Sequence, residues 1–221
     1  MAAQKEGPKH GSQRVRSRAP KRPRLRARVF LNLPYDRKSE RLFLAYICGV
    51  QAFGMDPRVT LEIPGGTRRL DRIFALIQSC QYSVHDLSRV ELDRKRPSTP
   101  RFNMPFELGL SVAWERMRPG EHVWFVMESM NYRFAKSLSD LNGTDPYVHG
   151  GTIAGVFREL SNAFGRVETQ PSVQQMREIY REVPRRVPEI LHQRGARSMF
   201  VASAFRDISI AASTAAARIV G

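Results

Sequence analysis

The sequence predicts an α/β domain in which a parallel sheet of four to five strands is covered by helices on both faces. Two patterns predict this class. Short runs that are almost wholly apolar alternate along the chain with longer segments whose apolar residues recur at helical spacing. The predicted strands are interpreted as too apolar to have a wet face, so both faces of the sheet are expected to be buried.

Four strands are expected from the apolar runs. The first run ends at Pro34 and the third at Asp86, which are residue types that favour turns. The second is rich in aliphatic residues and precedes a Pro-Gly-Gly sequence. The predicted strands are Val29–Pro34, Arg58–Ile63, Tyr82–Asp86 and His122–Met127.

Helices are expected between the strands. Apolar residues recur at helical spacing in Ser39–Phe53, which Gly54 ends, and in residues 70–77. A third helix is predicted over Phe106–Met117, and its apolar face is expected to consist of Phe106, Leu110, Ala113 and Met117.

The start of that third helix is the segment on which the functional argument depends. Asn103 is the expected N-cap, and Pro105 lies where a missing N–H is tolerated. Glu107 is then expected in the first turn, near the positive end of the helix dipole. A role limited to stabilising the helix start is the simplest alternative for this carboxylate.

The second half of the chain is predicted to be mostly helical. Tyr132–Gly151 is polar and glycine-rich and is expected to be irregular. Helices follow at Thr152–Phe164, at 173–193 with kinks or breaks at Pro184 and Pro188, and at Ser198–Val220. The expected organisation is a disordered basic tail over 1–28, an α/β domain over 29–165 and a helical extension over 166–221.

The charge of the chain is concentrated at one end. The 221 residues carry a net charge of +15, of which residues 1–28 contribute +9. Nucleic acid is therefore expected as a partner only through this tail. Cys48 and Cys80 lie within apolar patterns and are interpreted as small core residues of a reducing compartment. We expect a cytoplasmic protein with no signal peptide and no membrane partner.

Polar side chains follow each predicted strand. In parallel α/β sheets, ligands bind where the carboxyl ends of the strands meet. One crevice at that edge is expected to collect Tyr35, Asp36, Asp86, Arg101, Asn103 and Glu107. Asn32, Arg68 and Ser88 come from the same edge and complete the set of expected substrate-binding residues, with Arg68 and Arg101 suited to phosphate.

Asp86 and Glu107 are the predicted catalytic pair. Close carboxylates push their pKa values apart, so that one stays ionised while the other holds a proton. By analogy with glycoside hydrolysis, one carboxylate would stabilise or trap a cationic sugar, and the other would help the base to leave or activate water. The alternative is that both only cap turns and helices.

Other polar residues have weaker claims to a functional role. His85 is interpreted as a strand residue facing neighbouring helices, not as a base. Trp114 and Trp124 are interpreted as core residues. Three residues of the polar segment are candidates for a lid or second wall of the pocket: Asp140, Asn142 and His149. For Asp140 and Asn142, simple turns are the alternative. No spacing typical of a metal site, a P-loop or a dinucleotide-binding glycine motif is present, and no cofactor is expected.

Two segments resemble a known superfamily. The strand Tyr82-Ser83-Val84-His85-Asp86-Leu87-Ser88 and the helix start Asn103-Met104-Pro105-Phe106-Glu107-Leu108-Gly109 are similar to the nucleoside 2-deoxyribosyltransferase-like and TIR-like superfamily. The block of residues 101–109, together with residues 30–36, resembles bacterial TIR-like proteins in particular. The resemblance spans roughly residues 29–165.

The resemblance implies a flavodoxin-like fold, Glu107 as the catalytic carboxylate and Asp86 as its orienting partner. It implies cleavage or transfer of the N-glycosidic bond of NAD or of a nucleoside or nucleotide, with NAD as a substrate and not a cofactor. A homo-oligomer and a hydrolase role in antiviral defence or signalling are also implied. The alternative from a different class is a non-catalytic module of the same fold that senses a nucleotide or binds a protein.

Overall fold

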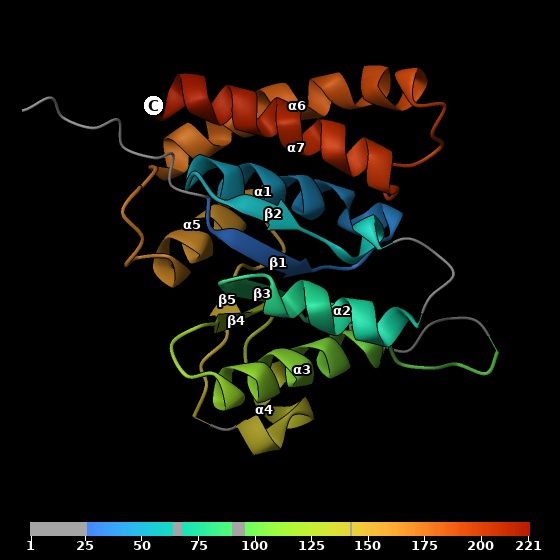
Figure 1. Ribbon diagram of the computed structural model, residues 1–221, viewed down its shortest axis with the longest axis vertical. Coiled ribbons are helices and arrows are strands. Elements are labelled where there is room, and N and C mark those ends of the chain that lie inside the picture. The colour runs from blue at the N-terminus through green and yellow to red at the C-terminus, as the bar shows by residue number, and fades with distance from the viewer. Residues whose placement is uncertain (1–25, 64–67, 90–95, 142) are drawn as a thin grey trace, which may run out of the picture.

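The computed structural model describes residues 26–63, 68–89, 96–141 and 143–221. Within them lies a five-stranded sheet with strand order β2-β1-β3-β4-β5 and parallel pairing throughout (Figure 1). The predicted fold class is confirmed. The strands are β1 (Arg28–Asn32), β2 (Asp56–Arg58), β3 (Tyr82–Asp86), β4 (Val123–Glu128) and β5 (Tyr147–Val148).

Helices cover both faces of the sheet. In chain order they are α1 (Glu40–Ala52), α2 (Arg69–Gln78), α3 (Asn103–Met117), α4 (Arg133–Ser137), α5 (Ile153–Ala163), α6 (Val173–Gln193) and α7 (Ala202–Ile219). α1 and α5 lie on one face, and α2 and α3 lie on the other (Figure 1). Because side chains alternate along a strand, Val29 and Leu31 of β1 join the core of the α1 face, whereas Phe30 packs with α2.

The two C-terminal helices form a further layer. α6 and α7 pack on α1 and on each other, on the side of α1 away from the sheet (Figure 1). α6 continues through Pro184 and Pro188, so the predicted break is absent. The two prolines are half-buried and exposed, whereas Val183 and Val187 are buried. The carbonyls that lose hydrogen bonds therefore lie toward the outer face of the helix.

The buried face of α3 is not the predicted one. Phe106 and Met117 are exposed, with 53% and 59% of their surface accessible. The buried residues are Met104, Glu107, Leu108 and Ser111. Asn103 is the first helical residue and Phe102 the N-cap, so Glu107 lies beyond the first turn. Compensation of the helix dipole is therefore a poor account of this carboxylate.

Smaller differences from the predicted elements have local causes. The second strand ends at Arg58, because the Glu62 carboxylate accepts a hydrogen bond from the Val59 N–H and turns the chain into the 3-10 helix η2 (Thr60–Glu62). The segment predicted to be irregular contains α4, β5 and the 3-10 helix η3 (Ser139–Leu141). A further 3-10 helix, η1 (Arg37–Ser39), precedes α1.

The remaining predictions about the fold concern the core and the tail. Cys48 and Cys80 are buried free thiols, as predicted. Trp114 and Trp124 pack at the margins of the core and are only half-buried. Residues 1–25 of the predicted tail lie outside the described residues. Across the described ranges, every helix is too short or too polar to cross a lipid bilayer.

Candidate functional site

The structure separates the predicted catalytic pair. Asp86 is the last residue of β3 and lies on the α1 face, where Tyr46 of α1 contacts it. The preceding residue, His85, lies on the α3 face, where its ring meets Phe30 edge to face. Glu107 comes from α3 and reaches the edge from that same face. The alternation of side chains along β3 therefore places the two carboxylates on opposite faces of the sheet.

Each carboxylate lines its own pocket. Leu33 and Pro34, which follow β1, line both pockets and form the partition between them. The single crevice predicted from the sequence is thus divided in two. The orienting role that the resemblance implied for Asp86 toward Glu107 is not supported, because the partition and the sheet edge separate the two side chains.

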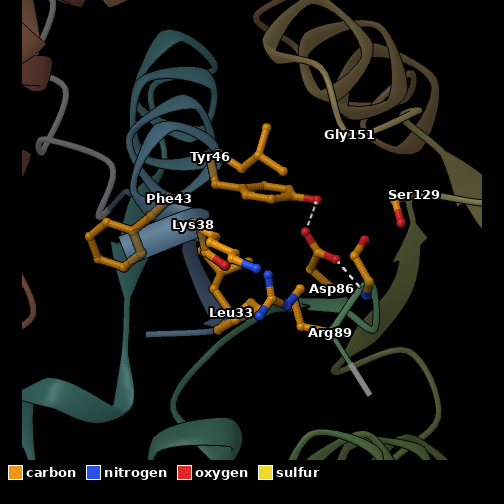
Figure 2. Close-up of a pocket in the computed structure, with 12 residues that line it drawn as sticks. Leu33, Lys38, Phe43, Tyr46, Asp86, Arg89, Ser129 and Gly151 are labelled. Carbon is orange, nitrogen blue, oxygen red and sulfur yellow. Dashed lines mark hydrogen bonds between the residues drawn. The ribbon is translucent and has the colours of Figure 1, made fainter. Parts of the chain in front are cut away.

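The Asp86 pocket has a volume of about 230 Å³ and lies between α1 and the loop before α5. Figure 2 shows the Tyr46 hydroxyl pointing at the Asp86 carboxylate from above. The hydroxyl donates to Asp86 Oδ2 at 3.0 Å, and the Ser88 N–H donates to Oδ1 at 2.9 Å. Lys38 and Arg89 lie on the opposite side of the pocket from Ser129 (Figure 2).

His149 completes the surroundings of Asp86. The Gly151 N–H donates to its Nδ1 at 3.0 Å, which places the ring proton on Nε2. Nε2 lies 3.1 Å from Ser88 Oγ and 3.4 Å from Asp86 Oδ2. The turn that holds this histidine needs glycine: Gly150 and Gly151 have φ angles of 62° and 67°.

The Asp86 carboxylate is therefore satisfied by its neighbours. Burial alone would raise its pKa, but hydrogen bonds from His149 and Ser88 outweigh burial, and the pKa of Asp86 is lowered from its usual value. An ionised group that accepts a hydrogen bond at each oxygen is well suited to hold the strand end, α1 and the His149 turn together.

The Glu107 pocket has a volume of about 300 Å³, at the lower end of the range for small-molecule sites. It collects residues from the end of β1 and the loop after it, one residue of η2, the first residue of α2, and residues just before and within the first turns of α3. The lining residues are Asn32, Leu33, Pro34, Tyr35, Thr60, Arg69, Arg101, Asn103, Met104 and Glu107.

The Glu107 carboxylate is buried and poorly stabilised as an anion. Its exposed fraction is 6%, and no hydrogen bond or ion pair joins its carboxylate to any other described residue. Burial raises the pKa of Glu107 to about 7, with only a partial offset from the charge of Arg69. A glutamate of this kind is half-ionised near neutral pH and is poorly solvated when ionised, which is the state of many catalytic carboxylates.

The walls of this pocket supply hydrogen-bonding groups and positive charge. The Tyr35 hydroxyl lies 3.0 Å from Thr60 Oγ1, and burial, reinforced by the charge of Glu107, raises the pKa of Tyr35. Arg101 forms an ion pair with Asp36 at 3.0 Å. Arg69 is exposed and has no ion-pair partner among the described residues.

The predicted substrate-binding residues divide among three positions. Asn32, Tyr35, Arg101 and Asn103 line the Glu107 pocket, and Ser88 lines the Asp86 pocket. Asp36 lines neither: its Oδ1 accepts from the Ser39 N–H, and its Oδ2 pairs with Arg89 and Arg101. Asp36 therefore ties together segments from both pockets instead of facing a ligand.

Arg68 does not take the place that was predicted for it. It is exposed just before α2 and lines neither pocket, whereas Arg69 occupies the expected place. The sequence alone does not show which of the two adjacent arginines reaches the pocket, because that depends on the direction in which α2 begins. Thr60 was not predicted, because it lay inside the segment interpreted as a strand.

The remaining candidates are also placed. His149 lies behind Asp86, where its Nε2 contacts Ser88 Oγ, and it lines neither pocket. Asp140 is exposed in η3, and Asn142 lies outside the described residues. Within the described ranges, His, Cys, Asp and Glu side chains form no group of three or more that is suited to a metal ion.

Neither protein-family models nor curated proteins give a match to this chain.

Proposed function

We propose that the protein cleaves the N-glycosidic bond of a nicotinamide nucleotide such as NAD, with Glu107 as the reacting carboxylate. As the bond between the sugar C1′ and the base nitrogen breaks, its electron pair leaves with the base. The Glu107 carboxylate then stabilises the cationic sugar or bonds to C1′. Water or a second base completes hydrolysis or transfer.

The observation that carries this proposal is the environment of Glu107. A carboxylate that is buried, accepts no hydrogen bond from the described residues and lines a cavity is poorly stabilised as an anion. A sugar that develops positive charge beside it would supply the missing partner. The interaction is thus stronger in the transition state than in the ground state, which is the requirement for catalysis.

The presence of a single acidic side chain favours a nicotinamide leaving group. Among the described residues that line the pocket, Glu107 is the one carboxylate, and Tyr35 is a weak acid because its pKa is raised. A purine or pyrimidine leaves readily only after it accepts a proton. Nicotinamide bears its positive charge before the bond breaks and leaves as a neutral molecule, so it needs no proton donor.

Arg69 and Arg101 support a substrate that carries phosphate. Both line the pocket, and guanidinium groups match phosphate oxygens in geometry and charge. A dinucleotide or nucleotide is therefore favoured over a free nucleoside. The resemblance to bacterial TIR-like proteins extends the proposal to a role in antiviral defence or signalling.

Replacement of Glu107 by glutamine tests the proposal. The full-length protein is incubated with NAD, with a nucleotide panel and with a nucleoside panel, and released base is measured by chromatography. We expect nicotinamide release by the wild type and a loss of about 10³-fold in Glu107→Gln, the scale of losing one strong transition-state interaction. Glu115→Gln, on the same helix outside the pocket, is the matched control and should retain activity.

Two outcomes would redirect the proposal. Equal turnover by Glu107→Gln and wild type would contradict it. Tight NAD binding without turnover by the wild type would favour the nucleotide-sensing alternative.

The pH dependence of turnover gives a third readout. If ionised Glu107 reacts, turnover should rise about tenfold per pH unit below 7 and level off above it. A fall above pH 7 would instead indicate a proton donor.

A further inference from the structure

A continuous chain of buried hydrogen bonds runs along the α3 face of the sheet and ends at the Glu107 pocket. Asn32 Nδ2 lies 3.0 Å from His85 Nδ1, and His85 Nε2 lies 2.9 Å from Ser83 Oγ. Ser83 Oγ lies 2.9 Å from His122 Nε2, and His122 Nδ1 lies 2.8 Å from the Cys80 carbonyl oxygen. All four of these side chains are buried.

The direction of every bond in this chain follows from its two ends. The Cys80 carbonyl can only accept, so His122 donates to it from Nδ1. Its Nε2 then accepts from the Ser83 hydroxyl, whose oxygen accepts from His85 Nε2. His85 Nδ1 is left to accept from Asn32.

The opposite end requires the same direction independently. Asn32 Nδ2 also lies 2.9 Å from the Met104 carbonyl oxygen, which can only accept. This contact identifies the amide nitrogen of Asn32, whose second hydrogen points at His85 Nδ1. Both rings are neutral in this arrangement, and burial lowers the pKa of His85 to about 3 and that of His122 below its usual value.

The chain leaves one atom of Asn32 without a partner among the described residues. Both amide hydrogens are used and no described residue donates to Oδ1, although Asn32 as a residue is only 2% exposed and lines the cavity that holds Glu107. Asn32 is hydrogen-bonded to the Met104 carbonyl oxygen in α3, about one turn before Glu107. Its Oδ1 is thus a fixed acceptor beside the reacting carboxylate.

We infer that Asn32 Oδ1 accepts a hydrogen bond from a ribose hydroxyl of the substrate, and that His85, Ser83 and His122 position it for that contact. Asn32 would be a specificity residue that selects ribose over deoxyribose. The identity of the sugar rests on the proposed function, whereas the orientation of Asn32 does not. A site built to bond a hydroxyl discriminates against the analogue that lacks it, because a buried acceptor is then left unpaired.

The first experiment tests the chain itself. Long-range proton–nitrogen NMR spectra of the uniformly ¹⁵N-labelled protein report which ring nitrogen of each histidine bears hydrogen. We expect His85 as the Nε2–H form and His122 as the Nδ1–H form, assigned with His85→Asn and His122→Asn. A proton on His85 Nδ1 would overturn the inference, whatever the protein does with NAD.

The second experiment tests the ligand contact. The wild type and Asn32→Ala are compared on NAD and on analogues that lack the 2′- or 3′-hydroxyl of the nicotinamide ribose. We expect the wild type to prefer NAD over one of the analogues by about tenfold in kcat/KM, and Asn32→Ala to show no preference. Equal discrimination by both proteins would overturn the contact.

If the protein binds NAD without turning it over, calorimetric titration with NAD and the same analogues replaces the kinetic comparison. Absence of NAD binding would overturn the assignment of the contact to a ribose hydroxyl, but not the orientation of Asn32.

The positioning role of the chain is tested at His85. Asparagine there keeps an acceptor near the place of Nδ1, so His85→Asn should retain the preference for the hydroxyl. His85→Leu should lose this preference, and its cooperative unfolding would show that the variant is still folded. Retention by His85→Leu would overturn the positioning role.

Discussion

Asp86 and Glu107 are both buried carboxylates at the carboxyl edge of one parallel sheet, but their surroundings differ in kind. Asp86 accepts hydrogen bonds from Tyr46 and Ser88 and lies beside His149, and its pKa is lowered. Glu107 accepts none from the described residues, and its pKa is raised to about 7. The protein thus stabilises the anion on one face of the sheet and leaves it poorly stabilised on the other.

This difference is the basis on which we propose a structural role for Asp86 and a reactive role for Glu107. A buried anion with hydrogen bonds at each oxygen contributes to stability and has little affinity left for a ligand. A buried anion without them costs stability and gains most when a positive charge develops nearby. The same chemical change at the two positions, carboxylate to amide, should therefore have opposite effects on the free energy of unfolding.

The largest effect is expected from Asp86→Asn. The amide N–H₂ would face the donors of Tyr46 and His149, so we expect a loss of about 4 kcal/mol in the free energy of unfolding. Urea denaturation at pH 7 measures it, with the exposed Asp140→Asn as the control. Because the folded pKa of Asp86 is depressed, its contribution is present above pH 3.8 and is lost as the pH falls through the folded pKa. A loss equal to that of the control would contradict a structural role.

Glu107→Gln should stabilise the fold, and the gain should depend on pH. The folded pKa of Glu107 is raised from 4.5 to about 7, so the stability linked to its proton is complete below pH 4.5 and is lost as the pH rises through 7. The variant avoids this loss and should be about 3 kcal/mol more stable than the wild type at pH 8. Denaturation at pH 4.5 and pH 8 measures the change. A difference independent of pH would mean that Glu107 is better solvated than the structure indicates.

Gly155→Ala tests the turn behind Asp86. A Cβ on Gly155 would lie 1.9 Å from the His149 carbonyl oxygen, so the turn that holds His149 must move. We expect a loss of about 2 kcal/mol, the usual cost of overpacking, and weaker pairing of His149 with Ser88. Thermal denaturation measures the loss, and the ¹⁵N chemical shifts of the His149 ring report the pairing. Unchanged shifts would contradict the role of this turn.

The smallest effect is expected from Gly109→Ala, two residues after Glu107. Nothing lies within 4 Å of the added Cβ, and the residue is exposed within α3. Alanine should therefore stabilise the helix by about 1 kcal/mol and leave turnover of NAD unchanged. Thermal denaturation and the chromatographic assay measure both. A loss of stability would show that the exposed face of α3 contacts something in the native protein.

The sequence predicts the sheet well because the strands are buried on both faces. Runs such as residues 29–33 and 123–127 are strongly apolar, which favours a buried strand, and their alternation with helical segments along the chain implies parallel pairing. The position of the site at the carboxyl edge follows from that topology, and the predicted Asn32, Tyr35, Arg101 and Asn103 do meet Glu107 in one pocket.

The predicted buried face of α3 was wrong because polar side chains take places in the core there. α3 buries Glu107 and Ser111 and exposes Phe106 and Met117, which inverts the apolar signal from which its orientation was predicted. α6 has no such residues on its inner face, and its predicted apolar face is the buried one. The side of the sheet on which Asp86 lies depends on strand register, which the sequence alone did not reveal.

The orientation of Asn32 was also beyond the sequence. Its partners come from three separate segments: β3, the start of α3 and, through Ser83, the residue before β4. His85 was predicted to be a strand residue facing helices, but no spacing in the chain connects it to His122 or Asn32. Contacts of this kind can be predicted only once the pairing of the strands is known.

The central claim is that the pKa of Glu107 is raised because its carboxylate is buried without hydrogen bonds from the described residues, whereas the pKa of the hydrogen-bonded Asp86 is lowered. Titration of both carboxylates tests this claim most directly. Carbon-13 NMR of protein labelled at the Glu and Asp carboxyl carbons follows each ionisation, and Glu107→Gln and Asp86→Asn assign the two signals. We expect the glutamate signal lost in Glu107→Gln to titrate near pH 7, and the aspartate signal lost in Asp86→Asn to titrate below pH 3.8. A Glu107 signal that titrates near 4.5, with the other glutamates, would contradict the account.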